Sequence, residues 1–384
     1  MKIAIDGLLL FKPYTGLQHT LIRHIQALTQ FSATGASGSN APDGLRIRLF
    51  VPFDMPATTT FSDSVDVYKS RFAGDRRIRR ALFRNFSMVR ESYAFGAELF
   101  HGHSYYLPAW MSLPSVVTVH DVIPLTHPQC VSASARAFFK RSLPRTLKRA
   151  GRIITPTDSV KRDLIRLFNV EDDRIDVVHW FVESPPEISE TVKKKMRREM
   201  NLPDQYILFI GRLEKKKNLT TLIRAFWSTH ITEPIEQRLL IVGPTGNAAS
   251  EIEQTIIEHR AQDCISFTGY LPDDAVSLVC QLADAVVLPS IAEGFGLPVI
   301  EAFAAGVPVL CSDIPVLREV GGDAARYAAA DDVKAWRLLL TEVCRDSQAR
   351  RQMADASRAR ASMFNNPRRY VDEINTVYQK ALER

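Results

Sequence analysis

The chain has 384 residues, of which 46% are hydrophobic and 24% charged, a globular composition long enough for two domains that excludes a disordered polypeptide. Its formal charge of +6 is unevenly distributed: residues 1–184 hold 24 basic and 16 acidic residues, and the remainder holds 25 and 27. The first half therefore carries +8 and the second −2. This asymmetry indicates that the first half meets an anionic partner: nucleic acid, phospholipid headgroups or a phosphorylated substrate.

The cysteines and the hydropathy pattern predict a compartment. Five cysteines, an odd number, are widely spaced and show no paired metal-ligand spacing, which predicts buried free thiols in a reducing cytoplasm. They are Cys130, Cys264, Cys280, Cys311 and Cys344. Asp6 interrupts the early apolar run, and no apolar stretch of about 18 residues follows, so we expect neither a signal peptide nor a spanning helix.

Short β-branched runs alternate with helical patterns through the first half, which is typical of βαβ units and a parallel sheet. The expected strands lie at 2–10, 45–52, 64–69, 98–101, 115–120, 152–155 and 174–179. Gly16 follows the first of them and could bring backbone N–H groups near an anion. A run rich in Ser, Gly and Ala at 32–44 predicts a surface loop.

A basic segment follows the third expected strand. Residues 69–90 hold eight basic residues and one acidic residue, with apolar residues interleaved at helical spacing. The basic residues are Lys69, Arg71, Arg76, Arg77, Arg79, Arg80, Arg84 and Arg90. The pattern predicts a basic amphipathic helix, which either binds an anionic membrane surface or presents a solvated face over a packed one.

Histidines follow two neighbouring strands. His101 and His103 could be part of a metal site, but the sequence reveals no third ligand, so we expect none. His120 ends the next strand, where open parallel sheets bind ligands, although a lone histidine there is also compatible with a structural role. Asp121 either orients the ring of His120 or caps the next turn.

The domain boundary is expected near a proline pair, Pro185 and Pro186, which leads into the charged run 193–198. We therefore divide the chain into domains at 1–184 and 185–364, with a terminal helix at 365–384 packing back toward the first domain. Further strands at 206–210, 239–242, 265–267, 285–288 and 307–311 predict a second doubly wound sheet.

Two basic residues follow the first strand of the second series. Arg212 leaves the strand end, and Lys217 stands just ahead of a helix that begins near Asn218. A planar guanidinium and a point charge form a workable pair for a diphosphate group. For Lys215 and Lys216 taken individually, a solvated basic turn is the favoured interpretation.

A glycine loop follows the strand at 285–288 and enters a helix with Pro298 in its first turn. Backbone N–H groups and the positive end of the helix dipole there predict a phosphate site. Glu293 precedes the helix and Glu301 lies about one turn inside it. Because phosphate repels carboxylates, we expect them to bind hydroxyl groups of a ribose and a sugar ring; two solvated acids are the alternative.

The segments "GRLEKKKN" and "EGFGLPVIE" resemble the donor-binding half of retaining glycosyltransferases of family 4, and the resemblance spans nearly the whole chain. It implies an α/β protein with the GT-B fold, in which two Rossmann-like doubly wound domains face each other across a cleft. The acceptor would bind the first domain and the nucleotide sugar the second.

The resemblance also implies roles for individual residues. Arg212 and Lys217 would hold the nucleotide diphosphate, with Gly16 assisting, and Glu301 would bind the ribose. Glu293 and the backbone of Phe295, Gly296 and Leu297 would hold the transferred sugar and phosphate, while His120 would lie beside the donor sugar as a catalytic residue with Glu293. Two features depart from the family: Gly16 stands alone where relatives have two or three glycines, and residues 179–183 replace an Asn-Gly turn.

The implied activity is metal-independent hexosyl transfer with retention of configuration. The "VHDVIPL" segment resembles bacterial mannosyl- and rhamnosyl-type transferases of lipopolysaccharide and exopolysaccharide assembly, so GDP-mannose is the favoured donor and UDP-glucose its competitor. The expected acceptor is a glycan or polyprenyl-linked oligosaccharide at the inner face of the bacterial membrane, with no nucleic acid partner. A glycan phosphorylase, a sugar-nucleotide epimerase and a non-catalytic binding subunit remain alternatives.

Overall fold

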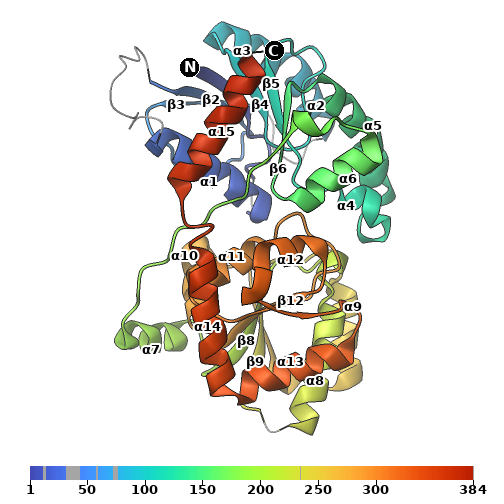
Figure 1. Cartoon of the computed structure of the whole chain (residues 1–384), viewed down its shortest axis with the longest axis vertical. Coiled ribbons are helices and arrows are strands. Elements are labelled where there is room, and N and C mark those ends of the chain that lie inside the picture. The colour runs from blue at the N-terminus through green and yellow to red at the C-terminus, as the bar shows by residue number, and fades with distance from the viewer. Residues whose placement is uncertain (12–13, 32–43, 58, 72–76, 234, 384) are drawn as a thin grey trace. The chain divides into compact units, whose positions relative to one another are not determined.

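The computed structural model describes residues 1–11, 14–31, 44–57, 59–71, 77–233 and 235–383, which form two compact units (Figure 1). Unit 1 comprises Met1–Trp180 together with the C-terminal segment from Pro367, and unit 2 comprises Phe181–Asn366. The expected loop at 32–44, apart from its last residue, lies outside the described residues, as does Arg76 of the basic segment.

Unit 1 is built on a seven-stranded parallel sheet with the order β3-β2-β1-β4-β5-β6-β7. The strands are β1 (Lys2–Asp6), β2 (Arg46–Val51), β3 (Val65–Lys69), β4 (Leu99–Gly102), β5 (Ser115–Thr118), β6 (Arg152–Thr155) and β7 (Ile175–Val177). All seven were expected, but β1 is shorter than the run 2–10. Its chain turns after Asp6, and the backbone N–H of Gly7 donates to the carbonyl of Phe50 at 2.8 Å.

Helices cover both faces of this sheet. They are α1 (Gly16–Phe31), α2 (Arg77–Asn85), α3 (Ser87–Phe95), α4 (Ile123–Thr126), α5 (Ala133–Arg149), α6 (Asp158–Phe168) and α15 (Pro367–Leu382). Residues of α3, α5 and α6 share one apolar cluster with Phe100 of β4. Because side chains alternate along a strand, His101 faces the opposite side, where it meets α15.

The helix expected over 69–90 is interrupted, because Lys69 ends β3 and two short helices, α2 and α3, follow. Arg84 is also withdrawn from the surface, since its Nε lies 2.6 Å from Oδ2 of the buried Asp6. The basic character of this segment is therefore carried by fewer exposed side chains than the sequence indicates.

Unit 2 is built on a six-stranded parallel sheet with the order β10-β9-β8-β11-β12-β13. Its strands are β8 (Tyr206–Ile210), β9 (Arg238–Val242), β10 (Ile265–Gly269), β11 (Ala285–Leu288), β12 (Val309–Ser312) and β13 (Arg326–Ala328). Its helices are α7 (Glu190–Glu199), α8 (Leu219–Thr232), α9 (Ala249–His259), α10 (Asp273–Gln281), α11 (Leu297–Ala304), α12 (Pro315–Gly321), α13 (Val333–Arg345) and α14 (Ser347–Ala361). Only β13 was not expected, because its three residues contain no apolar run.

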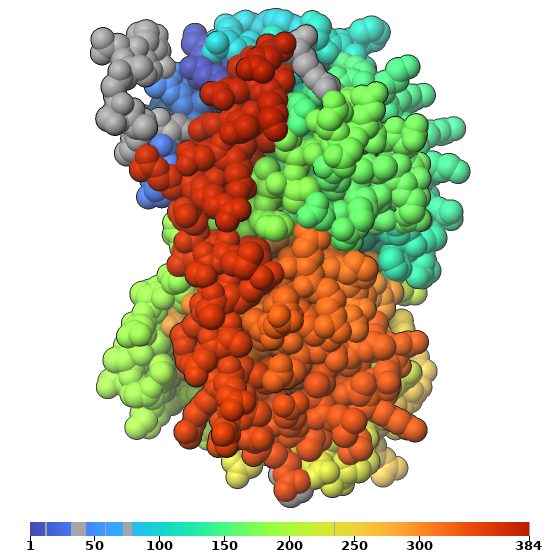
Figure 2. Space-filling model, in the orientation of Figure 1, coloured from blue at the N-terminus to red at the C-terminus, as the bar shows by residue number. Residues whose placement is uncertain are grey.

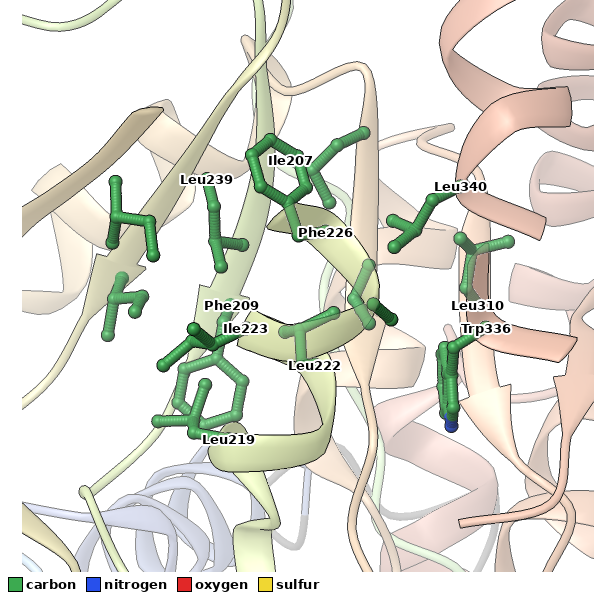
Figure 3. Packing of buried hydrophobic residues seen from close by; sticks show 14 of the residues in the cluster. Ile207, Phe209, Leu219, Leu222, Ile223, Phe226, Leu239, Leu310, Trp336 and Leu340 are labelled. Atoms are coloured by element: carbon green, nitrogen blue, oxygen red, sulfur yellow. The ribbon is translucent and has the colours of Figure 1, made fainter. Parts of the chain in front are cut away.

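The core of unit 2 joins the sheet to α8 and α13. Phe209 of β8 packs with Leu222 and Phe226 of α8, and the fully buried Trp336 of α13 belongs to the same cluster (Figure 3). This packing fixes the start of α8, and with it the loop between β8 and α8 at the carboxyl edge of the sheet.

The C-terminal helix α15 lies on the surface of unit 1, where Figure 2 shows it in red. Its contacts within the unit are with α1 and with strands β4, β5 and β6. Among the described residues, no helix is both long enough and apolar enough to cross a membrane. The five cysteines are free and buried, as expected.

Candidate functional site

The loop after β8 presents two of the expected site residues. Arg212 follows the strand directly, with a side chain that is 46% exposed, and Lys217 ends a single 3-10 turn with a side chain that is 12% exposed. Asn218 then adopts a left-handed conformation with φ 54° and starts α8. Asparagine tolerates this conformation better than most residues, so the "KKKN" sequence suits a sharp entry into a helix.

The loop after β11 is held in a tight conformation at its glycine. Gly296 has φ 97° and caps α11, and a Cβ added there would lie 2.8 Å from Cδ2 of Leu317. Pro298 occupies the first turn of α11, as expected. The side chain of Phe295 is buried against Phe364, with ring centroids 6.0 Å apart. The Phe295 side chain therefore anchors the loop by packing inward.

The structure brings these two loops together at the carboxyl edge of the sheet. Lys217 Nζ donates to Glu293 Oε1 at 2.6 Å, and Ser290 Oγ donates to the same oxygen at 2.6 Å. The backbone N–H of Ile291 donates to the carbonyl of Lys216 at 2.8 Å. Lys217 and Glu293, which the sequence placed on separate loops with separate roles, thus form one buried ion pair.

Glu293 keeps its charge although its side chain is only 8% exposed. Burial raises the pKa of its carboxyl, but the charges of Lys217 and Lys216, with hydrogen bonds from Lys217 and Ser290, outweigh burial and lower it. Lys216 is itself only 22% exposed, so the interpretation of this lysine as a solvated residue of the turn is wrong. Lys215 is exposed, as expected.

The other expected site residues lie at defined places in the two units. Glu301 lies about one turn inside α11, as the sequence predicted. Arg212 shares the loop of Lys217, and its Nε lies 4.0 Å from Glu214 Oε1. Gly16 is exposed as the first residue of α1 in unit 1.

His120 lies just beyond β5 in unit 1 and is 5% exposed. Its Nε2 donates to the backbone carbonyl of His103 at 2.6 Å, and its ring stacks on Trp180 at 5.5 Å. Because a carbonyl only accepts, the neutral ring carries its proton on Nε2, which leaves Nδ1 as the basic nitrogen. Burial lowers the pKa of His120 to about 4, although the His103 carbonyl and Asp121 favour the charged form.

Asp121 caps the next turn, which was one of its two considered roles. Its Oδ1 accepts from the backbone N–H of Ile123 at 3.0 Å, and its Oδ2 accepts from the hydroxyl of Tyr105 at 3.2 Å. The Tyr105 ring lies edge-on to His120 at 5.5 Å, and the charge of Asp121 itself favours the charged form of His120, an effect on its pKa that burial outweighs.

The third imidazole that the sequence did not reveal is His24 of α1. Ligand nitrogens of His24, His101 and His103 all lie within 4.8 Å of one another. Both nitrogens of His24 are hydrogen-bonded to hydroxyls, at 2.8 Å to Tyr370 and at 3.0 Å to Tyr378. Both nitrogens of His24 are therefore already engaged within the protein, whereas Nδ1 of the buried His103 has no hydrogen-bond partner among the described residues.

His101 has the same kind of environment. Its Nδ1 lies 2.9 Å from the hydroxyl of Tyr378, and its Nε2 lies 2.8 Å from Oγ1 of Thr118. Burial is the largest cause that lowers the pKa of His24, to about 3, and that of His101 well below its usual value. His24 and His101 therefore form a neutral, hydrogen-bonded pair that joins α15 to α1 and to the sheet.

Sequence reasoning missed several residues that shape these sites. Ser290 and Asn218 carry local signals, a hydroxyl three positions before Glu293 and an asparagine at a helix start. Trp180 and Tyr378 carry none, because each contacts residues far away in the sequence.

Comparisons with known proteins agree with this architecture. The profile described as "Glycosyltransferase Family 4" matches residues 41–184, and that described as "Glycosyl transferases group 1" matches residues 192–360. The O-antigen chain mannosyltransferase B of Escherichia coli is 30% identical over 273 residues that cover 70% of each chain. The O-antigen chain mannosyltransferase RfbU of Salmonella typhimurium is 29% identical, over 65% of this chain and 63% of that relative.

Solved structures share the fold across the whole chain. Sucrose-phosphate synthase from Thermosynechococcus elongatus superimposes with a TM-score of 0.79 at 17% identity, covering 99% of this chain and 98% of that one. HepE of Anabaena, in complex with UDP and glucose, gives 0.75 at 17% identity and covers 99% of each chain. With two parallel α/β units, both profiles matched and these relatives, the chain belongs to the family 4 glycosyltransferases of the GT-B fold.

Proposed function

We propose that this glycosyltransferase moves a hexose, with mannose favoured, from a nucleoside diphosphate sugar to a glycan or lipid-linked oligosaccharide, with retention of configuration. The curated relatives support mannose, because two bacterial O-antigen mannosyltransferases are 30% and 29% identical to the chain. The assembly of lipopolysaccharide or exopolysaccharide is the corresponding role, and GDP is the favoured nucleotide.

The observation that carries this proposal is the meeting of the two loops in unit 2. The Lys217–Glu293 pair lies where the loop after β8 contacts the loop that enters α11. A cation, an ionised carboxylate and a helix N-terminus at one edge of a parallel sheet supply what a diphosphate joined to a sugar requires.

Each site residue then has a chemical task. Arg212, Lys217 and the N-terminus of α11 stabilise the negative charge that develops on the departing diphosphate. Glu301 accepts hydrogen bonds from the ribose hydroxyls, and Glu293 accepts them from hydroxyls of the transferred sugar. These positive groups perform the stabilisation without a metal ion.

The reaction proceeds by attack on the face from which the diphosphate leaves. The bond between the anomeric carbon and the phosphate oxygen breaks, the acceptor oxygen forms the new bond, and a phosphate oxygen takes the acceptor proton. In this proposal, Gly16 of unit 1 assists in binding the diphosphate and His120 of unit 1 lies beside the donor sugar. The backbone of Phe295, Gly296 and Leu297 in unit 2 binds the transferred sugar and the phosphate. Nδ1 of the neutral His120 can accept a hydrogen bond from a sugar hydroxyl.

A thermal-shift panel tests the donor. We expect GDP-mannose to raise the unfolding midpoint more than UDP-glucose or ADP-glucose at equal concentration, because only a ligand of the native state stabilises it. A larger shift with UDP-glucose would replace the nucleotide and the sugar but keep the reaction class. No shift with any nucleotide sugar would contradict the assignment of the unit 2 site.

The acceptor remains on the side of unit 1 in this proposal. Residues 1–184 of the chain carry a net charge of +8. This charge favours an anionic acceptor, such as a polyprenyl diphosphate-linked oligosaccharide at the inner face of the cell membrane. Incorporation of radiolabelled mannose into a lipid-extractable product, and its absence without a lipid-linked primer, would support this acceptor.

A further inference from the structure

Unit 1 exposes basic and apolar side chains together on α2, α3, α5 and the loop at 107–112. Residues 69–149 hold 14 basic and 4 acidic residues, a balance of +10 that exceeds the charge of the whole chain. We call the surface formed by these elements the basic-aromatic face. Its defining residues are Leu82, Phe86, Trp110, Arg141, Arg145 and Lys148.

An apolar ridge runs along α2 into α3. The backbone N–H of Phe86 donates to the carbonyl of Leu82 at 3.1 Å, and that of Arg90 donates to Phe86 at 3.0 Å, so the helical path continues across the junction. Leu82 and Phe86, four residues apart, therefore lie on one face, and they are 56% and 60% exposed. Trp110, 67% exposed, lines a hollow of about 430 Å³ together with Phe86, so both side chains belong to the wall of the same hollow.

The Trp110 loop is fixed to helices on both sides. On one side, the backbone N–H of Ala109 donates to Asn85 Oδ1 at 2.6 Å, at the end of α2. On the other, the guanidinium of Arg149, the last residue of α5, donates to the carbonyl of Pro108 at 2.8 Å. Trp110 therefore lies between the apolar ridge and the C-terminal end of α5, and the three elements present one surface.

The α5 helix supplies the charge of this surface. It holds six basic residues and no acidic residue, and it lies outside the basic segment at 69–90. Arg141, Arg145 and Lys148 are exposed at spacings of four and three, which places them on one helical face. Within the described part of the chain, no carboxylate forms an ion pair with any of the three, so their charge is not neutralised from within.

The combination of residues identifies the occupant. Exposed apolar side chains alone would suit a protein partner, and exposed cations alone would suit any polyanion. Exposed Trp, Phe and Leu beside unpaired Arg and Lys are the composition that binds the interface of an anionic bilayer, where apolar rings enter and cations meet headgroups. We propose that the basic-aromatic face docks unit 1 on an anionic lipid surface, with Phe86 and Trp110 entering the headgroup region.

The docking proposal rests on the proposed function in one respect only: docking would hold the enzyme at the membrane that contains its lipid-linked acceptor. Docking itself needs neither donor nor acceptor. It is therefore measured by flotation of the full chain with vesicles of phosphatidylglycerol and phosphatidylethanolamine, and with vesicles of phosphatidylcholine alone.

We expect the chain to float with the anionic vesicles and not with the neutral ones, and to be released by high salt. The triple variant Arg141→Gln/Arg145→Gln/Lys148→Gln should bind on the order of a hundredfold more weakly, since each cation near the surface contributes roughly fivefold. Phe86→Ser/Trp110→Ser should bind at least tenfold more weakly while keeping its salt dependence.

Matched controls lie in unit 2. Lys194→Gln/Lys195→Gln/Arg198→Gln removes the same charge from α7, where these residues are exposed, and Leu338→Ser removes an apolar side chain that is 61% exposed. Both controls should float like the unchanged chain. Equal losses in the two charge triples, or an unchanged Phe86→Ser/Trp110→Ser variant, would overturn the proposal.

Two further outcomes also overturn it: tighter binding to single-stranded RNA than to anionic vesicles, and a dimer in ultracentrifugation that Phe86→Ser dissolves. The donor-induced thermal shift is recorded on every variant. A retained shift with lost flotation is expected, whereas a missing shift in the unchanged chain speaks against the proposed function and leaves the flotation result valid.

Discussion

The candidate reactive groups of the two units are buried to nearly the same extent, but one is neutral and the other is charged. His120 of unit 1 is 5% exposed and neutral, whereas the side chain of Glu293 in unit 2 is 8% exposed and ionised. Burial disfavours the charged form in both cases. The comparison shows that the neighbours of a buried group, and not its depth, determine its charge.

The neighbours differ in kind. Lys217 and Ser290 both direct donors at one oxygen of Glu293, and Lys216 adds a second positive charge. Around His120 the contacts are a backbone carbonyl and aromatic rings, and Asp121 directs its oxygens to other partners. Unit 2 thus keeps Glu293 charged by pairing it, while unit 1 keeps His120 uncharged by shielding it from water.

Acidification should produce the largest difference in stability between the two units. His24, His101, His103 and His120 all have a pKa below the ordinary value of 6.5, chiefly because of burial. The unfolded chain binds protons below about pH 6.5 that the folded unit 1 does not, so stability is complete above that pH and falls as the pH falls. Each histidine costs up to about 1.4 kcal/mol per pH unit, or several kcal/mol in all by pH 5.

Hydrogen exchange followed by mass spectrometry at pH 7, 6 and 5 measures this loss separately in each unit. Unit 2 should keep its protection over this range, because the lowered pKa of Glu293 makes its contribution disappear only below about pH 4.3. Loss of protection in unit 2 first would contradict the assignment of the acid-sensitive groups to unit 1.

Removing one member of the charged pair should have the next largest effect. Glu293→Ala should lower the transfer rate by about 10² to 10³ and leave nucleotide affinity largely intact. It should also destabilise unit 2 by about 3 to 5 kcal/mol, because Lys217 is left buried without its partner. In urea unfolding, the double variant Lys217→Ala/Glu293→Ala should lose less than the sum of the two single changes.

The exposed pair of Asp355 and Arg358 is the control for that experiment. Their side chains are 75% and 59% exposed, so Asp355→Ala should cost less than about 1 kcal/mol. Strictly additive losses at Lys217 and Glu293 would show that the two side chains are not coupled.

Two tyrosines of α15 test the neutral network. The hydroxyl of Tyr378 contacts both His24 and His101, whereas that of Tyr370 contacts His24. Tyr378→Phe should therefore destabilise unit 1 by about 2 to 4 kcal/mol and Tyr370→Phe by about 1 to 2 kcal/mol, since each leaves buried nitrogens unsatisfied. Chemical denaturation of both variants at pH 7.5 measures the difference, and the reverse order would be evidence against the shared hydroxyl.

A smaller effect is expected at the glycine that caps α11. Gly296→Ala places a Cβ 2.8 Å from Leu317 Cδ2 at φ 97°, which should destabilise unit 2 by about 1 to 2 kcal/mol. Gly44→Ala is the matched control, because a Cβ there meets no atom within 4 Å. Equal unfolding midpoints for the two variants would show that the strain at Gly296 is relieved by a shift of Leu317.

The strands and the loop motifs of both units were predictable because their signals are local. Short apolar or β-branched runs mark every strand except β13, and the order of strand, glycine loop and helix locates Glu293 and Glu301. The rule that ligands bind at the carboxyl ends of parallel strands placed Lys217 and Glu293 at one edge. It did not predict their ion pair, because that depends on loop conformations fixed by Asn218 and Gly296.

The histidine network was beyond sequence reasoning for a physical reason. His24 and His101 are separated by two strands and two helices in the chain, and the hydroxyl that joins them belongs to Tyr378. Nothing local to any of the three residues indicates the others. Likewise, the burial of Arg84 against Asp6 removed a charge that the composition had assigned to the surface.

Unit 1 is built from two separate segments of the chain, and this has a consequence for synthesis of the protein on the ribosome. Residues of α15 complete unit 1, yet they are translated after all of unit 2. Until they emerge, His24 and His101 lack the tyrosine hydroxyls that satisfy them, whereas unit 2 is a single continuous stretch of chain. We therefore expect the usual order of folding during translation to be reversed, with unit 2 reaching its native state while unit 1 still waits for its last helix.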